Sequence, residues 1–246
     1  ADSRDGSLEI GKSFIIGKIV NCRTVLGRGI RDHGAVIDCD KVRAVDALLI
    51  ENLLKIEDCE TADTLRGIEG NCAKFYFVTL DELILKQKDD FYLDERNRRP
   101  PLDNMNALLS FLYTLLAHDV ESALETVGLD PYVGFFHTDR PGRASLALDM
   151  MEELRPFMAD RLALNLVNLR QISGDDFFKK ENGGVILTEN GRKEVIGAWQ
   201  KRKQDTITHP YLNEKILIGL LPYVQAMLMA RFLRGDIDGY PPFFMN

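Results

Sequence analysis

Long apolar runs are missing from this sequence, which contains no stretch of eighteen or more apolar residues. The most apolar segment, Ile216–Leu221, is too short to span a bilayer. The first ten residues, ADSRDGSLEI, also lack the charged region followed by an apolar region that defines a signal peptide. We therefore expect neither membrane insertion nor secretion.

Cysteine is scarce and scattered, with no Cys-x-x-Cys pair. The four cysteines are Cys22, Cys39, Cys59 and Cys72. Such spacing argues against a structural zinc site and against a disulfide framework. It favours reduced thiols and a cytoplasmic location.

The net charge of −7 looks unfavourable for a nucleic-acid binder, whose affinity comes largely from neutralising phosphates. A net charge averages over all faces of a protein, however, and acidic residues concentrate in Glu51–Glu60. The basic residues gather in four other segments, Arg23–Arg31, Arg96–Arg99, Arg140–Arg143 and Lys201–Lys203. A local basic groove is compatible with this charge, which neither proves nor excludes DNA binding.

Helical periodicity covers most of the chain. A polar, proline-containing segment, Lys86–Asp103, lacks it and predicts a long loop, and Gly183–Thr188 reads as the one short strand. The sequence thus predicts one mainly α domain over residues 1–246, a multi-helical fold with at most a small β-hairpin. The predicted helical segments are Ile10–Gly27, Val42–Ile56, Asp63–Leu85, Asn104–Val127, Phe157–Gln171, Asn190–Lys203 and Tyr211–Leu233.

The segment GFFHTDRPGRASLALDMMEELRP places a histidine before a loop and two acids behind it. Asp149 and Glu152 are three residues apart on a predicted helix, so their side chains share one face. The ordinary interpretation is a solvated acidic face on an amphipathic helix, with His137 a structural histidine. The alternative is a metal site, because a short loop can return the histidine to the start of the helix.

A second candidate element is LRGIEG, Leu65–Gly70. Each glycine costs roughly 1 kcal/mol relative to alanine inside a helix, so two of them need a reason. Close packing of a second helix is one explanation, and access for a nucleic-acid strand beside Glu69 is another. Arg66 could pair with Glu69 or hold a phosphate.

Three separated motifs together resemble one known family. LRGIEG, NALLSFLYTLL (Asn106–Leu116) and the segment Gly128–Pro156 occur in the order found in the CRISPR-associated integrase of spacer acquisition, the Cas-one family. The closing segments HPYL and LRGDIDGYPPF are also similar, nearest to its type I-C branch. The resemblance covers most of the chain.

The resemblance implies a metal-dependent DNA endonuclease and integrase that inserts foreign DNA into a CRISPR array. Matched motif by motif, the family's site falls on Glu69, His137, Asp149 and Glu152. It makes Glu69, His137 and Glu152 the metal ligands, with Asp149 orienting a water or a ligand, or joining them. One imidazole with carboxylates suits Mn²⁺ or Mg²⁺ better than zinc.

The resemblance also implies partners: prespacer and repeat DNA, a second copy of the chain in the full-length protein, the Cas-two protein and the Cas-four protein. Family members begin with a β-rich domain, which we do not find in this sequence. We therefore expect residues 1–246 to form the helical catalytic domain.

Several arginines are candidates for DNA contacts. Arg140 and Arg143 flank a Pro-Gly turn near the expected site, and Arg98 and Arg99 lie in the predicted loop. Arg66 is the remaining candidate, one turn before Glu69.

Two other classes of function stay open at this point. One is a helical DNA-binding scaffold without catalysis. The other is a metal-dependent phosphohydrolase that acts on small phosphate esters, which needs a closed pocket where an integrase needs an open basic groove.

Overall fold

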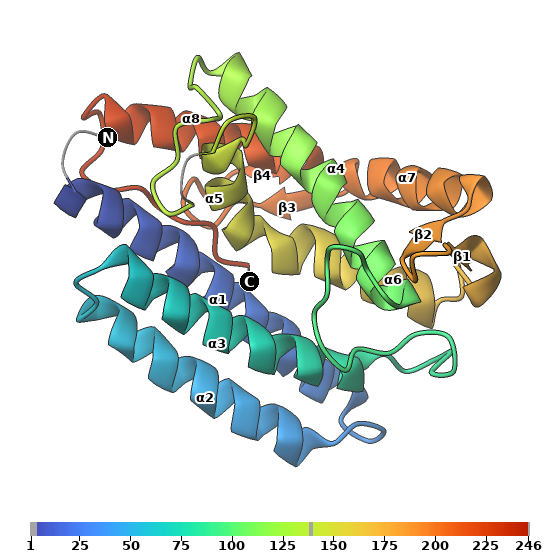
Figure 1. The fold of residues 1–246 in the computed structure, drawn as a ribbon. Helices are drawn as coiled ribbons and strands as arrows, with labels where there is room; N and C mark the ends of the chain where they lie inside the picture. The colour runs from blue at the N-terminus through green and yellow to red at the C-terminus, as the bar shows by residue number, and fades with distance from the viewer. Residues whose placement is uncertain (1–3, 138–139, 246) are drawn as a thin grey trace.

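The computed structural model describes residues 4–137 and 140–245, and for residues 4 and 5 the backbone alone. Helices make up most of it, so the predicted mainly α class is confirmed (Figure 1). None of the helices in these ranges is both long and apolar enough to cross a bilayer. The helices are α1 (Arg4–His33), α2 (Cys39–Glu57), α3 (Ala62–Leu80), α4 (Asn104–Thr126), α5 (Ser145–Leu154), α6 (Arg161–Asn168), α7 (Glu189–Lys203) and α8 (Leu221–Leu233).

The short helix α5 occupies the centre of the fold. Helices α1, α2 and α3 lie side by side as one layer, and α4, α7 and α8 lie on the other side of α5 (Figure 1). Helix α5 packs directly against α1 and α4, and nine of its ten residues are buried. Buried apolar side chains from all eight helices form one continuous core around it.

Helix α1 runs further than the sequence predicts, to His33 instead of ending near Gly27. Gly29 lies inside the helix because the chain packs closely there: an added Cβ atom would come within 2.3 Å of the Leu83 side chain. This glycine therefore serves helix packing, not helix termination.

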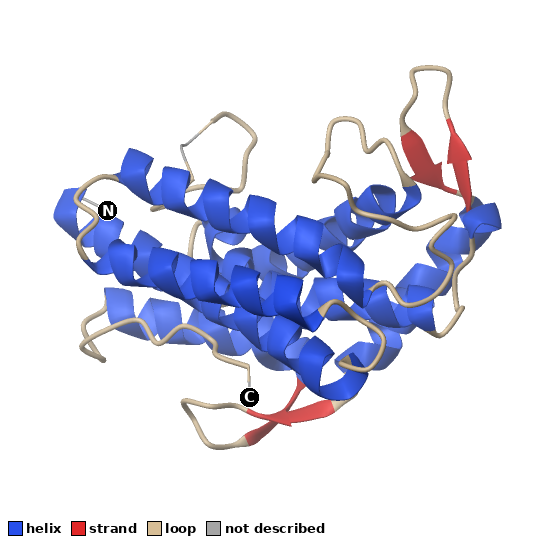
Figure 2. Ribbon diagram, turned by 90° about the horizontal axis from the view of Figure 1, so that it is seen from below, coloured by secondary structure: helices blue, strands red, loops and turns tan. Residues whose placement is uncertain are grey.

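Two hairpins are present among the described residues, one more than predicted (Figure 2). Strands β1 (Phe177–Lys179) and β2 (Val185–Leu187) form the expected one. Strands β3 (Thr206–Thr208) and β4 (Lys215–Leu217) form the second, so the helix predicted from Tyr211 begins only at Leu221. Its strands are three residues long, too short for a period-two pattern to stand out in the sequence.

Single 3₁₀ turns occupy Asp81–Leu83, Gly174–Asp176 and Ile218–Leu220. Between α5 and α6 the chain widens into a π-helical turn, Arg155–Asp160. Pro156 has no N–H to donate to the carbonyl four residues earlier, which disfavours the ordinary α-helical ladder at this point.

The segment Lys86–Asp103 is a loop, as predicted, and it is anchored to the helices. Phe91 and Leu93 are buried, and the Asn106 side chain donates to the carbonyl of Glu95 at 2.9 Å. The loop therefore keeps a defined path over α3 and α4.

The C-terminal segment is tied to α1 and α5 by buried polar groups. Glu153 accepts hydrogen bonds from the Tyr240 hydroxyl at 2.5 Å, the Gln225 amide at 2.7 Å and the Phe243 backbone N–H at 2.9 Å. The Asn21 amide donates to the carbonyl of Phe243 at 2.8 Å. Burial nevertheless raises the pKa of Glu153 to about 7.

This carboxyl predicts a pH dependence of stability. Its pKa is about 7 in the fold against 4.5 unfolded, so its contribution is complete below pH 4.5 and is lost as the pH rises to 7. Asp160, whose pKa burial raises from 3.8 to about 6, acts in the same direction. Between about pH 5 and 7, the free energy of unfolding in urea should fall on the order of 3 kcal/mol. Glu153→Gln should flatten this slope, and an unchanged slope would contradict the assignment.

Candidate active site

Asp149 folds the loop that carries His137 onto the start of α5. Its Oδ2 atom accepts hydrogen bonds from the backbone N–H groups of Phe135 at 2.6 Å and Phe136 at 2.9 Å. Its Oδ1 atom accepts the backbone N–H of His137 at 2.8 Å and lies 2.6 Å from the Nδ1 atom of the same ring. Asp149 is completely buried, so the interpretation of a solvated acidic face is wrong here.

His137 is thereby held in one orientation. Because the Asp149 carboxylate accepts a hydrogen bond from Nδ1–H, the neutral ring carries its lone pair on Nε2. That atom lies 3.8 Å from the Oε1 atom of Glu152, on the next turn of α5. A nitrogen lone pair is thus directed towards a second carboxylate.

Glu152 is a buried carboxylate between two cations. Its Oε1 atom lies 2.7 Å from Nη1 of Arg155, and its Oε2 atom lies 2.8 Å from Nζ of Lys18 on α1. Burial alone would raise the pKa of Glu152, but the charges of Arg155 and Lys18 outweigh it and hold that pKa well below its usual range. The carboxylate is therefore ionised at neutral pH.

Lys18 links Glu152 to Glu69. Its ammonium also contacts the Glu69 carboxylate, which α3 contributes from the other side. Burial lowers the pKa of Lys18, but Glu152 and Glu69 raise it well above its ordinary value, so the ammonium stays charged. Glu69, His137 and Glu152, distant in the sequence, thus surround one region, with Lys18 in contact with both glutamates.

The glycines beside Glu69 border open space. A Cβ atom added at Gly67 or Gly70 would meet no atom of another described segment within 4 Å, so helix packing does not explain either residue. Glu69 keeps 22% of its side chain exposed, whereas Glu152 keeps 3%. The region is open on the α3 side and closed on the α5 side, which leaves an approach for a ligand.

Glu69, His137 and Glu152 are side chains of the types that bind a divalent cation, although their ligand atoms are too far apart to coordinate one ion in this conformation. Among the described residues, no three acidic, histidine or cysteine side chains are close enough to hold a metal ion as they stand. Lys18 instead supplies the positive charge between Glu69 and Glu152. Glu152 Oε2 is buried, and although it lies in ion-pair range of Lys18 it makes no directional hydrogen bond. That oxygen, the Nε2 lone pair of His137 and the Glu69 carboxylate are ligands suited to Mg²⁺ or Mn²⁺.

Four of the five predicted DNA-contacting arginines, Arg98, Arg99, Arg140 and Arg143, are close enough to influence one another's charge. Burial lowers the pKa of Arg143, and the nearby charges of Arg140, Arg99 and Arg98 lower it further. These guanidinium groups therefore repel one another electrostatically. Arg140, Arg98 and Arg99 are exposed. A basic surface of this kind is suited to a phosphate backbone.

Arg66 has a different role from the one its position suggests. It donates to the carbonyl of Phe136 at 2.9 Å, pairs with Asp63 at 2.5 Å and lies over the Phe136 ring. The structure uses this guanidinium to hold the His137 loop against α3. Residues 138 and 139, inside the same loop, lie outside the described residues.

Sequence reasoning missed Lys18 and Arg155. Lys18 occurs in an apolar stripe of α1, next to the buried Ile19 and one turn after Phe14 and Ile15. A lysine on a buried helix face needs a partner, and this signal was available. Arg155, three residues after Glu152, lies over the Tyr113 ring at 4.9 Å.

Comparison with known proteins decides the family. The family model described as "CRISPR associated protein Cas1" matches residues 1–201. The chain belongs to the Cas1 family. A CRISPR-associated endonuclease Cas1 of Rhodospirillum rubrum is 54% identical over 240 residues, covering 96% of this chain and 70% of that protein. One of Leptospira interrogans is 46% identical over 236 residues, covering 96% of this chain and 92% of that protein.

Solved structures agree on the fold. A Cas1 protein from Thermotoga maritima is 27% identical, with a TM-score of 0.80 over 94% of this chain and 67% of that chain. A casposase bound to integration product has a TM-score of 0.83 over 97% of this chain and 67% of that chain, at 21% identity. At that identity the second likeness concerns the fold alone.

Lys18→Met should destabilise the fold and make it respond to metal. The change leaves buried Glu152 with Arg155 as its one close cation among the described residues, and breaking a buried ion pair costs about 3–5 kcal/mol. Thermal denaturation should show a lower Tm, with a larger rise on adding Mn²⁺ than in the unmodified protein. Lys74→Met, at an exposed lysine of α3, is the matched control. Equal melting of the two variants would contradict this account.

Asp149→Asn should loosen the His137 loop. Both oxygens of Asp149 accept N–H groups, so either orientation of an asparagine amide turns an NH₂ group towards a donor. We expect Mn²⁺ affinity to fall about 10–100-fold, as for other groups that orient a metal-binding histidine. Titration calorimetry measures this, and unchanged affinity would show that Asp149 does not position His137.

Proposed function

We propose that this chain is a divalent-metal-dependent DNA endonuclease and integrase that inserts foreign DNA fragments into a CRISPR array. The observation that carries the proposal is the convergence of His137 Nε2, Glu152 and Glu69 beside the exposed arginines. Membership of the Cas1 family and the endonuclease relatives support it.

In this proposal Glu69, His137 and Glu152 hold Mg²⁺ or Mn²⁺, and Asp149 keeps His137 in the ligating tautomer. Such an ion polarises a phosphodiester and lowers the pKa of an attacking hydroxyl. The exposed Arg98, Arg99 and Arg140 and the partly exposed Arg143 bind the phosphates on either side of the reacting one. The reaction is phosphoryl transfer: a 3′-hydroxyl of the fragment displaces a 3′-oxygen in the repeat, so one phosphodiester forms as another breaks.

The proposed partners are prespacer and repeat DNA, a second copy of the chain and other adaptation proteins. A relative of Geobacter sulfurreducens, 39% identical over 242 residues, is named a Cas4 exonuclease–Cas1 endonuclease fusion, which supports a Cas4 partner. A structure named a partial Cas6-RT-Cas1–Cas2 complex shares the fold, with a TM-score of 0.82, and is compatible with a Cas2 partner. We place the chain nearest to type I-C on its closing segments, and in the cytoplasm on its four free cysteines.

The shape of the site bears on the other classes of function. Gly67 and Gly70 face open space and Glu69 is partly exposed, so the site is open on one side. A hydrolase of small phosphate esters would need a closed pocket. A scaffold without catalysis does not require a buried glutamate, Glu152, placed 3.8 Å from the Nε2 atom of an oriented histidine, His137.

His137→Ala should abolish both Mn²⁺ binding and DNA cleavage, because it removes the nitrogen ligand and leaves the carboxylates in place. The matched control is His118→Ala, at an exposed histidine of α4 that lies 3.7 Å from Glu121. Calorimetry with Mn²⁺ and a cleavage assay on branched DNA measure the two effects. If the His137 variant cut DNA as well as the control, the assignment would be wrong.

A further inference from the structure

Three arginines meet on a part of the surface outside the site described above. Arg28 comes from α1, Arg161 from the start of α6 and Arg202 from the end of α7. Arg28 lies ten residues beyond Lys18 on α1, which is about 15 Å along the helix. We call these three side chains the arginine cluster.

Phe157 holds two members of the cluster in place. The Arg161 guanidinium lies 5.7 Å and the Arg202 guanidinium 5.0 Å from the centre of its ring. Arg202 also donates from Nη2 to the carbonyl of Phe157 at 2.8 Å, and its buried Nε atom has no hydrogen-bond partner among the residues that the structure describes. Both guanidinium groups are therefore oriented before any ligand arrives.

The Arg161 guanidinium lies in an unfavourable concentration of positive charge. Burial lowers the pKa of Arg161 to about 10; the charges of Arg202 and Arg28 lower it further, and Asp32 offsets only part of this effect. Arg161 makes no hydrogen bond or ion pair within the described residues. Two acids lie beside the cluster: Asp32 is paired with Arg31 at 2.8 Å, and Asp205 borders Arg202. An anionic ligand would relieve this repulsion.

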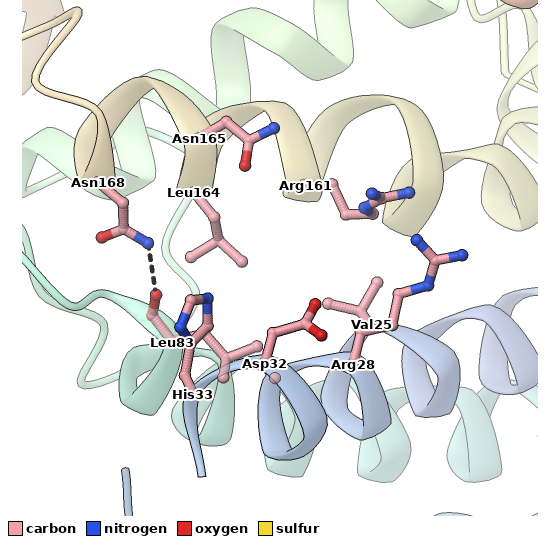
Figure 3. Close-up of a pocket in the computed structure, with 10 residues that line it drawn as sticks. Val25, Arg28, Asp32, His33, Leu83, Arg161, Leu164, Asn165 and Asn168 are labelled. Atoms are coloured by element: carbon pink, nitrogen blue, oxygen red, sulfur yellow. Dashed lines mark hydrogen bonds between the residues drawn. The ribbon is translucent and has the colours of Figure 1, made fainter. Parts of the chain in front are cut away.

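Two adjoining hollows open beside the cluster. Arg28 and Arg161 belong to both, and Figure 3 shows them reaching towards each other from α1 and α6 across the first hollow. The second hollow continues past Arg202 to the exposed threonines Thr206 and Thr208 of β3. The two hollows therefore present three arginines, together with Asp32 and Asp205. Arginines spread over two adjoining hollows suit a polymer with repeated phosphates better than a single small anion.

We propose that the arginine cluster binds successive phosphates of a nucleic-acid backbone, as a second DNA contact away from the site around Glu152. The inference rests on the proposed function, which makes DNA the substrate. Guanidinium groups bind phosphate oxygens through paired N–H donors, and three of them presented over two adjoining hollows neutralise consecutive phosphates.

The test is DNA affinity as a function of salt, measured by fluorescence anisotropy with a labelled duplex in EDTA, so that metal chemistry does not contribute. Arg161→Gln and Arg28→Gln are compared with Arg192→Gln, which removes the same charge from an exposed position on α7. Each cluster variant should weaken binding about fivefold or more and reduce the slope of log affinity against log salt by about 1. The control should match the unmodified protein. Arg161→Gln should keep its Tm, because it removes a repelled charge.

Three outcomes would overturn the inference. If both cluster variants bind DNA with unchanged affinity and slope while the unmodified protein binds well, the cluster is not a DNA contact and the proposed function stands. If inorganic phosphate raises the Tm of the unmodified protein but not of Arg161→Gln, with DNA affinity unchanged, the ligand is a small oxyanion. If the unmodified protein itself binds no DNA, the proposed function fails and the inference falls with it.

Discussion

The arrangement depends on one buried charge, the carboxylate of Glu152. A carboxylate removed from water is costly unless cations and donors compensate it, and here Lys18 and Arg155 do so from two sides. Lys18 extends the same compensation to Glu69 on another helix. Helices α1, α3 and α5 therefore meet through a single ion network, and the place where they meet is the candidate active site.

The three acidic residues of α5, Asp149, Glu152 and Glu153, each bind a different part of the structure, because the helix is buried on nearly all sides. Asp149 accepts hydrogen bonds from the His137 loop, Glu152 pairs with the two cations, and Glu153 binds the C-terminal segment. Pro156 and the π-helical turn follow, ending at Asp160, which accepts hydrogen bonds from two tyrosine hydroxyls. The geometry around His137 is thus coupled to packing across the whole fold.

Helical periodicity predicted the class of the fold, and motif order predicted which acidic residues and which histidine would meet. Helix ends were less predictable. Glycine near the end of α1 suggested termination, but Gly29 lies inside the helix because the Leu83 side chain packs against it in the folded chain. The strands of the second hairpin, β3 and β4, are three residues long, which is too short for an alternating apolar pattern to be recognised in the sequence. Of the two interpretations of Asp149 and Glu152, the solvated acidic face is wrong because both side chains are buried in a helix between two layers. Lys18 was missed because its meaning depends on two acids distant in the sequence. The roles of the site residues stay predictions.

The central claim is that Glu69, His137 and Glu152 hold a divalent cation, with Lys18 providing the positive charge when the ion is absent. Anomalous scattering from Mn²⁺-soaked crystals tests it most directly. The account predicts an anomalous peak between these three side chains, with the Lys18 ammonium displaced from Glu152. No peak there at high Mn²⁺ concentration, or a peak elsewhere with Lys18 still bound to both glutamates, would contradict it.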